Sequence, residues 1–294
     1  MQAGVVFPQK EIGADPASIR DFAQNVEGMG YSHILAFDHV VGADPTHRPG
    51  WQGYTHQDMF HEPFVLFGYL AALTHLELVT GVIILPQRQT VLVAKQAAEV
   101  DVLSGGKMRL GIGVGWNPVE YEALGKDFHI RGRVVEEQIE LLRLLWGQNV
   151  ITYKGHFHTV TEAGINPLPV RRSIPIWTGG RADALLRRTA RLADGWFPLG
   201  PPDDEMKQII ERLRSYLREA HRDPDKFGIE AQVYTKNGNV DEWMRLTKRW
   251  QELGATHICI NTMDANFTSL QQHLDAIRRY KEALGSLSGV KSGI

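Results

Sequence analysis

The sequence predicts an α/β protein folded as a (β/α)8 barrel, or TIM barrel, with one inserted hairpin segment. Short β-branched apolar runs alternate with longer segments of helical period, which is typical of parallel strands joined by covering helices. About eight such strand-helix units are present, the number that closes a barrel. The chain of 294 residues, 43% hydrophobic and 22% charged, is also long enough to bury one large core.

Strands and helices are expected in alternation along the chain. The predicted strands span residues 3–8, 33–37, 77–85, 108–114, 174–178, 195–198, 229–234 and 257–261. The predicted helices span residues 16–28, 63–74, 90–103, 133–146, 182–193, 203–220, 240–253 and 269–284. Pro16 and Pro63 are typical of a first helical turn, and Gly28 and Gly254 of a helix end. A doubly wound open sheet is the alternative fold with the same alternation.

Two segments interrupt this alternation. Residues 41–61 are rich in Gly, Pro, His and aromatic residues without any period, as in lids and binding loops. Within residues 147–173, the stretch VITYKGHFHTVT predicts a β-hairpin that turns at Lys154 and Gly155. We therefore expect a single domain over residues 1–294 with an insertion at about 147–173. Residues 285–294 are small and polar enough to fray.

Composition and charge restrict the kinds of partner. The 32 basic and 34 acidic residues give a formal net charge of −2 without a run of one sign, so neither nucleic acid nor a membrane is expected as partner. Without a charged leader or a long apolar span, the expectation is a cytoplasmic protein with a small-molecule substrate. Cys259, the only cysteine, has apolar neighbours typical of a buried strand thiol. His156 and His158 are expected at the surface, and no metal is expected, because no nearby carboxylate or cysteine completes a ligand set.

Candidate functional residues follow the predicted strands, because the loops after barrel strands gather on the face that carries the active site. They are Asp38, His39, Leu85, Pro86, Gln87, Arg88, Gly113, Val114, Gly115, Trp116, Asn117, Thr178, Gly179, Gly180, Arg181, Pro198 and Leu199. Gly111, Gly113 and Gly115 leave bare backbone at a strand end, against which a flat ligand can lie. The alternative is that these glycines only relieve crowding inside the barrel.

The segment Thr178-Gly179-Gly180-Arg181 joins a predicted strand to a helix. The free N–H groups and positive dipole end of a helix start suit a phosphate, and Arg181 adds positive charge. A tight turn explains the same Gly-Gly pair equally well. Arg131 and Arg133 precede another helix, where they either reach an anionic cofactor tail or pair with Glu136 and Glu137.

Longer motifs carry a resemblance to a known family. The blocks VTGVIILPQRQTVLVAKQAAEVDVLSGGKMRLGIGVGWNPVEYEALG, RGRVVEEQIELLRLLW and PIWTGGRADALLRRTARLADGWFP cover much of residues 77–198. In order and spacing they resemble the bacterial luciferase-like flavin and deazaflavin oxidoreductases, and within them the branch that depends on coenzyme F420. The resemblance implies a (β/α)8 barrel with an insertion. It also implies that the barrel mouth holds an isoalloxazine-like ring and that hydride passes between ring and substrate.

The resemblance further implies roles for individual residues. The cofactor-binding residues would be Gly81, Val82, Gly113, Val114 and Gly115 for the ring, and Thr178, Gly179, Gly180 and Arg181 for the phosphate. Relatives carry a cis peptide bond that corresponds to Gly81–Val82. Deazaflavin-dependent dehydrogenases of the family place an Asp-His pair at the position of Asp38 and His39, which makes these two residues the catalytic candidates. The alternative is structural, with Asp38 capping the loop and His39 packed under it.

The chain departs from the sugar-phosphate dehydrogenases of the family, which have a tryptophan after the Asp-His pair and a glutamate after the glycine strand. Here these places fall near Ala43 and Trp116, so a sugar phosphate is not the expected substrate. An apolar or aromatic substrate is expected instead. The residues that would line its pocket are Trp51, Tyr54, His56 and Trp116, together with Phe60. Ordinary packing of the loop is the alternative explanation for them.

Coenzyme F420 is the predicted cofactor, and FMN is the alternative because both present a tricycle with a phosphate-bearing chain. With FMN the protein would be a luciferase-like monooxygenase that uses reduced flavin and O2. A second alternative is a non-catalytic binding module, since the family includes members that bind no flavin. A homodimer is expected from the resemblance.

Overall fold

The computed structural model describes residues 1–236 and 238–289 and contains two compact units. Unit 1 comprises Met1–Ala36, Leu73–Glu77 and Gly180–Ile294, and unit 2 comprises Phe37–Ala72 and Leu78–Gly179.

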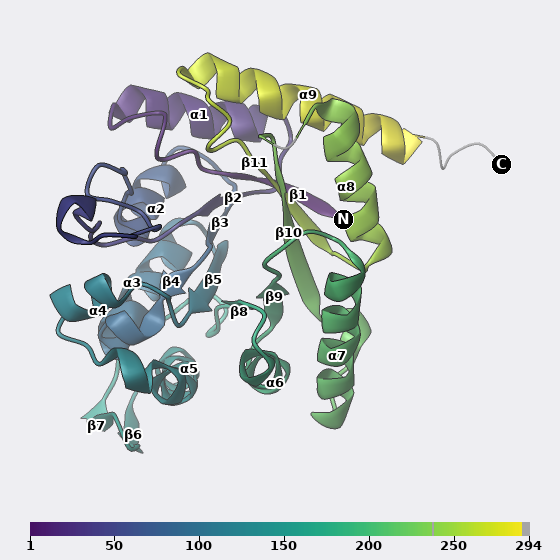
Figure 1. The fold of residues 1–294 in the computed structure, drawn as a ribbon. Helices are drawn as coiled ribbons and strands as arrows, with labels where there is room; N and C mark the ends of the chain where they lie inside the picture. The colour runs from purple at the N-terminus through teal and green to yellow at the C-terminus, as the bar shows by residue number, and fades with distance from the viewer. Residues whose placement is uncertain (237, 290–294) are drawn as a thin grey trace. The chain divides into compact units, whose positions relative to one another are not determined.

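The described residues form eleven strands and nine α-helices (Figure 1). The strands are β1 (Gln2–Val6), β2 (His33–Ala36), β3 (Glu77–Thr80), β4 (Ile83–Ile84), β5 (Met108–Gly113), β6 (Ile151–Lys154), β7 (Thr159–Ala163), β8 (Ile176–Gly179), β9 (Gly195–Phe197), β10 (Gly228–Tyr234) and β11 (His257–Asn261). The helices are α1 (Pro16–Gly28), α2 (Pro63–Ala71), α3 (Thr90–Leu103), α4 (Pro118–Ala123), α5 (Arg131–Gly147), α6 (Asp183–Leu192), α7 (Asp204–Glu219), α8 (Val240–Glu252) and α9 (Leu270–Gly289).

In unit 1, five strands lie side by side and parallel in the order β2, β1, β11, β10, β9. The first strand of the chain thus pairs with the last one, as closure of a barrel requires and an open sheet does not. Helices α1 and α9 lie next to each other (Figure 1), and α6 contacts α7. The strands are almost wholly buried, because apolar residues face both the barrel interior and the covering helices.

In unit 2, β5 is the central strand and pairs in parallel with β3, β4 and β8. Helix α3 contacts both α2 and α5. Trp146 near the end of α5 is fully buried, and its indole N–H donates to the Ala94 carbonyl of α3 at 3.0 Å. The antiparallel strands β6 and β7 form the inserted hairpin, which confirms the hairpin predicted within residues 147–173.

The described residues contain eight parallel strand positions once β4 is counted as the continuation of β3, and helices follow them in alternation. The predicted (β/α)8 barrel is confirmed, and the doubly wound alternative is wrong. The strand predicted at 77–85 is interrupted at Gly81 and Val82, whose peptide bond is cis, as predicted. Helix α4 was not predicted. Helix α9 extends to Gly289, and residues 290–294 of the stretch expected to fray lie outside the described residues.

No helix within the described residues is long and apolar enough to cross a bilayer.

Truncating Trp146 tests the packing of α5 on α3. We expect Trp146→Ala to lower the free energy of unfolding by about 3–5 kcal/mol, because it leaves a cavity and removes the indole hydrogen bond. The control Val65→Ala alters a side chain on α2 that is 73% exposed and should cost less than about 0.5 kcal/mol. Denaturant unfolding of both variants measures the difference, and similar losses would contradict the packing described here.

Candidate active site in unit 2

Asp38 and His39 directly follow β2, and their side chains have different partners. Asp38 is buried, and its carboxylate accepts a hydrogen bond from Arg88 at 2.8 Å. The His39 ring bonds to Glu120 at 2.9 Å. The structure thus resolves the predicted pair into two separate contacts, a buried ion pair and a histidine-carboxylate pair.

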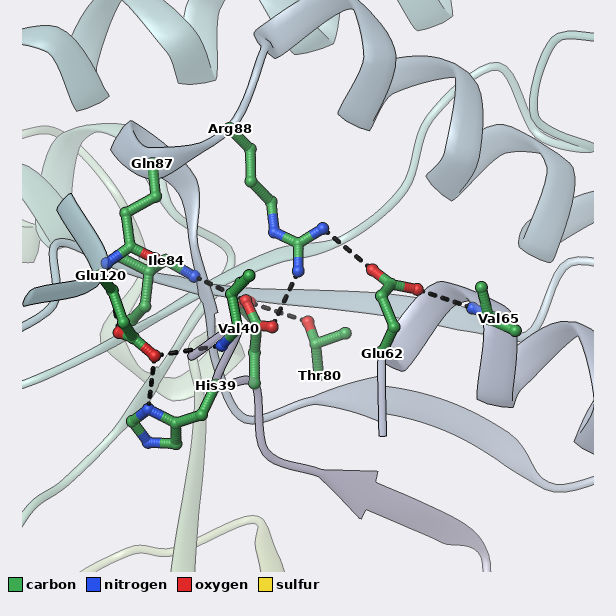
Figure 2. A network of polar contacts seen from close by, with 11 residues as sticks. His39, Val40, Glu62, Val65, Thr80, Ile84, Gln87, Arg88 and Glu120 are labelled. Carbon is green, nitrogen blue, oxygen red and sulfur yellow. Dashed lines mark hydrogen bonds and ion pairs between the residues drawn. The ribbon is translucent and has the colours of Figure 1, made fainter. Parts of the chain in front are cut away.

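Arg88 connects two carboxylates (Figure 2). Its guanidinium donates to Asp38 at 2.8 Å and to Glu62 at 2.9 Å. Glu62 also caps α2 by accepting from the Val65 N–H at 2.8 Å, and Asp38 accepts from the Ile84 N–H at 3.3 Å. Within unit 2, this ion network therefore joins the loop that begins at Phe37, the start of α2 and strand β4.

Burial and ion pairing oppose each other in this network. Burial raises the pKa of Asp38, while Arg88 and the Ile84 N–H act in the opposite direction. Burial also acts against the charge of Arg88, but its pairing with Asp38 and Glu62 outweighs burial and raises the pKa of Arg88. Arg88 therefore stays charged, and the network compensates its charge inside the protein.

Glu120, which was not a predicted site residue, is the partner of His39. It lies in the first turn of α4, a helix that starts with Pro118 and is capped by Asn117, whose side chain accepts from the Val119 N–H at 3.0 Å. The Asn-Pro pair is a sequence signal for this helix start, so α4 was predictable from the chain. The contact of Glu120 with His39 was not, because 81 residues separate them.

Three donors contact the Glu120 carboxylate. One oxygen accepts from His39 Nδ1 and from the Val40 N–H at 3.1 Å, and the other accepts from the Gln87 amide at 3.3 Å. Burial acts to raise the pKa of Glu120, but these bonds outweigh it and lower the pKa below the ordinary value of 4.5. An ionised carboxylate only accepts hydrogen bonds, so His39 donates from Nδ1, and the neutral form of the ring has its lone pair on Nε2.

Aromatic side chains from the long loop and from the end of β5 surround His39. The ring centroids of Tyr54 and Phe60 lie 4.4 Å and 4.7 Å from that of His39, and the centroid of Trp116 lies 6.3 Å away. Trp51 packs against Trp116 at 5.8 Å. Trp116 remains 51% exposed, while the His39 side chain is only 12% exposed. His39 therefore lies in a largely apolar, aromatic environment.

Four of the five residues predicted for the substrate pocket thus gather with His39, namely Trp51, Tyr54, Phe60 and Trp116. His56 is exposed, and its backbone N–H donates to the Ala43 carbonyl at 3.1 Å. No ring contact between His56 and His39 is among the described aromatic pairs. Gly53 is required by this packing, because a Cβ there would lie 2.1 Å from the Trp116 ring.

Gly113 and Gly115 are explained by contacts with Val82 and with Ile84 of β4. A Cβ on Gly113 would lie 2.7 Å from the Val82 side chain, and one on Gly115 would lie 2.7 Å from Ile84. Gly115 also has a φ of +68°, which side chains rarely adopt. Crowding inside the barrel, the alternative given above, therefore accounts for these two glycines. A role in cofactor binding for Gly81, Val82, Gly113, Val114 and Gly115 stays a prediction.

The segment from Thr178 to Arg181 ends β8, and α6 begins two residues later at Asp183. The Gly180 N–H donates to the Phe197 carbonyl at 3.3 Å, and the Gly180 carbonyl accepts from the Trp196 indole at 2.7 Å. Arg181 forms an exposed ion pair with Glu205. No side chain caps α6. Phosphate binding by Thr178, Gly179, Gly180 and Arg181 stays a prediction.

The expectation of a surface position holds for His156, which is exposed, but not for His158, which is half-buried. The His158 ring contacts the Glu137 carboxylate and the Thr90 hydroxyl, each at 2.7 Å. Glu137 also accepts from backbone N–H groups of the hairpin, among them that of His156 at 2.7 Å.

Arg131 donates to the Phe128 carbonyl at 2.6 Å and lies over the Phe128 ring.

Comparison with known proteins identifies first the fold and then the family of the chain. An F420-dependent secondary alcohol dehydrogenase in complex with an F420-acetone adduct has the same fold, with a TM-score of 0.79 at 16% identity over 96% of this chain and 98% of that one. The family model for luciferase-like monooxygenases matches residues 1–287. The chain therefore belongs to the luciferase-like monooxygenase family, whose members are oxidoreductases and monooxygenases.

Two relatives illustrate its range. An uncharacterized protein of Mycobacterium tuberculosis is 31% identical over 272 residues, which are 88% of this chain and 92% of the relative. An FMNH(2)-dependent dimethylsulfone monooxygenase of Pseudomonas fluorescens is 30% identical over 74% of this chain and 57% of that protein.

The two carboxylates on Arg88 provide a matched comparison. Asp38→Asn removes the buried carboxylate charge that compensates the Arg88 guanidinium. We expect a loss of about 3–5 kcal/mol in the free energy of unfolding. Glu62→Gln removes a charge that is 37% exposed on the same guanidinium and should cost under about 1 kcal/mol. Urea unfolding of the two variants tests this order. Equal losses would show that Asp38 does not compensate the Arg88 charge.

The lowered pKa of Glu120 predicts a pH dependence. The Glu120 carboxylate stabilises the folded state above pH 4.5, and this contribution is lost as pH falls through the lowered pKa. The free energy of unfolding of wild type should exceed that of Glu120→Gln by about 1–3 kcal/mol at neutral pH. This difference should become smaller below pH 4.5. Unfolding curves of both proteins across this range measure the difference. A difference independent of pH would contradict an ionised, hydrogen-bonded Glu120.

Proposed function

We propose that the chain is an oxidoreductase that transfers hydride between coenzyme F420 and a small, apolar or aromatic organic substrate. The observation that carries this proposal is the pairing of His39 with Glu120 inside an aromatic environment at the end of β2. The motif blocks of the F420 branch and the fold shared with an F420-dependent secondary alcohol dehydrogenase support it.

The residues present fit a planar ring with polar edges. Trp116 offers a half-exposed aromatic face, and Val82 and Ile84 add aliphatic surface next to Gly113 and Gly115. Asn117 is 1% exposed, and its amide nitrogen is a buried donor without a hydrogen-bond partner within the part of the chain described.

Such a donor fits a ligand with carbonyl oxygens, as the deazaflavin and flavin rings have. We propose that Gly81, Val82, Gly113, Val114, Gly115 and Trp116 hold the ring. The phosphate of the tail is proposed at Thr178, Gly179, Gly180 and Arg181, where it would replace Glu205 as the partner of Arg181.

When bound, the deazaflavin supplies a carbon centre that accepts or donates one hydride. His39 handles the proton that accompanies this transfer. Its Nε2 lone pair accepts the proton of a substrate hydroxyl as hydride leaves the adjacent carbon, and in the reverse direction Nε2 returns the proton to a carbonyl oxygen. Glu120 holds the ring in this tautomer and stabilises the imidazolium, since its charge lies 2.9 Å from Nδ1.

Asp38 has a different part in this proposal. Its bonds to Arg88 and to the Ile84 N–H fix the backbone immediately before His39. Tyr54, Phe60 and Trp116 exclude water from the imidazole and favour a substrate without charge. Asp38 is therefore proposed as a positioning residue and His39 as the catalytic residue.

An FMN-dependent monooxygenase is the second candidate. The 30% identity with the FMNH(2)-dependent dimethylsulfone monooxygenase favours it, because that similarity is closer than the 16% identity with the F420-dependent alcohol dehydrogenase. The same aromatic environment would then hold a small neutral substrate next to reduced flavin. A homodimer stays a prediction for either candidate.

Cofactor titration followed by turnover tests the proposal. We expect saturable quenching of F420 fluorescence, and F420-linked oxidation of small secondary alcohols by wild type. His39→Asn should bind F420 equally and lose about 10²–10⁴-fold in kcat, because only proton transfer is removed. His75→Asn changes a histidine whose side chain is 90% exposed before β3, and this control should keep wild-type kcat. Binding of FMN without binding of F420 would overturn the first candidate in favour of the second.

A further inference from the structure

Three side chains able to bind a metal converge in unit 1, and none of them belongs to the candidate active site of unit 2. His33 begins β2, Glu230 lies on β10 and Cys259 lies on β11. All three are buried, with 0% exposure for the side chains of His33 and Glu230. The Glu230 Oε1 atom is 2.7 Å from His33 Nε2 and 2.9 Å from Cys259 Sγ, and Sγ is 3.3 Å from Nε2.

The strand register brings these groups to one point. On β1, Gly4 is paired with His33 on one side and with Cys259 on the other. Glu230 lies on β10, which pairs with β11. A Cβ on Gly4 would lie 2.2 Å from His33 Nε2, so the imidazole occupies the space that any side chain at position 4 would need. Glycine on β1 is thus a condition for this cluster.

Ser32 orients the imidazole. The Ser32 hydroxyl donates its single proton to the Ala3 carbonyl at 2.9 Å, and it lies 2.8 Å from His33 Nδ1. It therefore accepts from Nδ1–H, and Nε2 presents its lone pair to the cluster. That lone pair faces a carboxylate oxygen at 2.7 Å, so two acceptors point at each other and need a cation or a proton between them. A hydrogen bond to the distal nitrogen is also how metal-binding histidines are oriented.

We propose that His33 Nε2, Glu230 Oε1 and Cys259 Sγ bind one transition-metal dication of the zinc class. Imidazole, thiolate and carboxylate together suit Zn²⁺ or Co²⁺, whereas Mg²⁺ and Ca²⁺ prefer oxygen ligands. Binding converts the Cys259 thiol to a thiolate and releases its proton to solvent. The metal would link β2, β10 and β11 and would have a structural role. This proposal revises the expectation of a metal-free protein and does not depend on the proposed function.

Cobalt in place of zinc provides a direct readout, because a thiolate bound to Co²⁺ gives a charge-transfer band in the near ultraviolet. The site is buried, so the metal must enter before the strands close, and the full chain should be produced in cobalt-supplemented minimal medium. We expect purified wild type to retain an equimolar amount of cobalt and to show the band. Elemental analysis after growth with zinc should likewise find an equimolar amount of zinc.

Two variants assign the band. Cys259→Ser should lose the charge-transfer band, because a hydroxyl does not give this transition. His158→Gln alters the His158–Glu137 pair in unit 2 and should keep band and stoichiometry. If wild type produced under these conditions contains neither cobalt nor zinc, the proposal is overturned and the cluster is a hydrogen-bonded imidazolium-carboxylate pair. A band that persists in Cys259→Ser would overturn it equally, and the wild-type result alone decides if that variant does not fold.

Discussion

Charged groups buried in unit 2 must be compensated inside the protein, and the candidate site depends on how this occurs. Asp38 and Glu62 share the guanidinium of Arg88, while Glu120 is surrounded by donors from His39, Val40 and Gln87. The two sets meet at consecutive residues, 38 and 39. Because an unpaired buried charge costs several kcal/mol, each set tolerates little displacement. Both sets of contacts hold the backbone at residues 38 and 39.

This arrangement links electrostatics to chemistry. The donors around Glu120 keep it ionised despite burial, and an ionised Glu120 selects the Nδ1–H tautomer of His39. The aromatic residues around His39 add a neutral, poorly hydrated environment that suits proton transfer to or from an uncharged substrate. In unit 1, Ser32 fixes the proton on Nδ1 of His33 by the same rule, and a carboxylate and a thiol then face the lone pair on Nε2.

Local sequence patterns predicted the helices and strands because interactions between neighbouring residues largely determine where these begin and end. The strand at 257–261 and the helices at 16–28 and 90–103 have the predicted bounds, since apolar runs, proline starts and glycine stops are read from neighbouring residues. The cis bond at Gly81–Val82 was predicted only through the family resemblance. The partners of Asp38 and His39 depend on residues 50 and 81 positions away, a separation at which spacing carries no information. Gly113 and Gly115 were assigned to ligand contact or to packing, and only the positions of Val82 and Ile84 show that packing suffices.

The tautomer of His39 tests the account most directly. Nitrogen-15 NMR of the full chain with labelled histidine, assigned through His39→Asn, distinguishes a protonated Nδ1 from a protonated Nε2 at neutral pH. We expect that neutral His39 carries its proton on Nδ1 and that Glu120→Gln weakens this preference. A neutral His39 protonated on Nε2 in wild type would contradict the hydrogen bond to Glu120, and with it the proposed role of Nε2 as the proton acceptor.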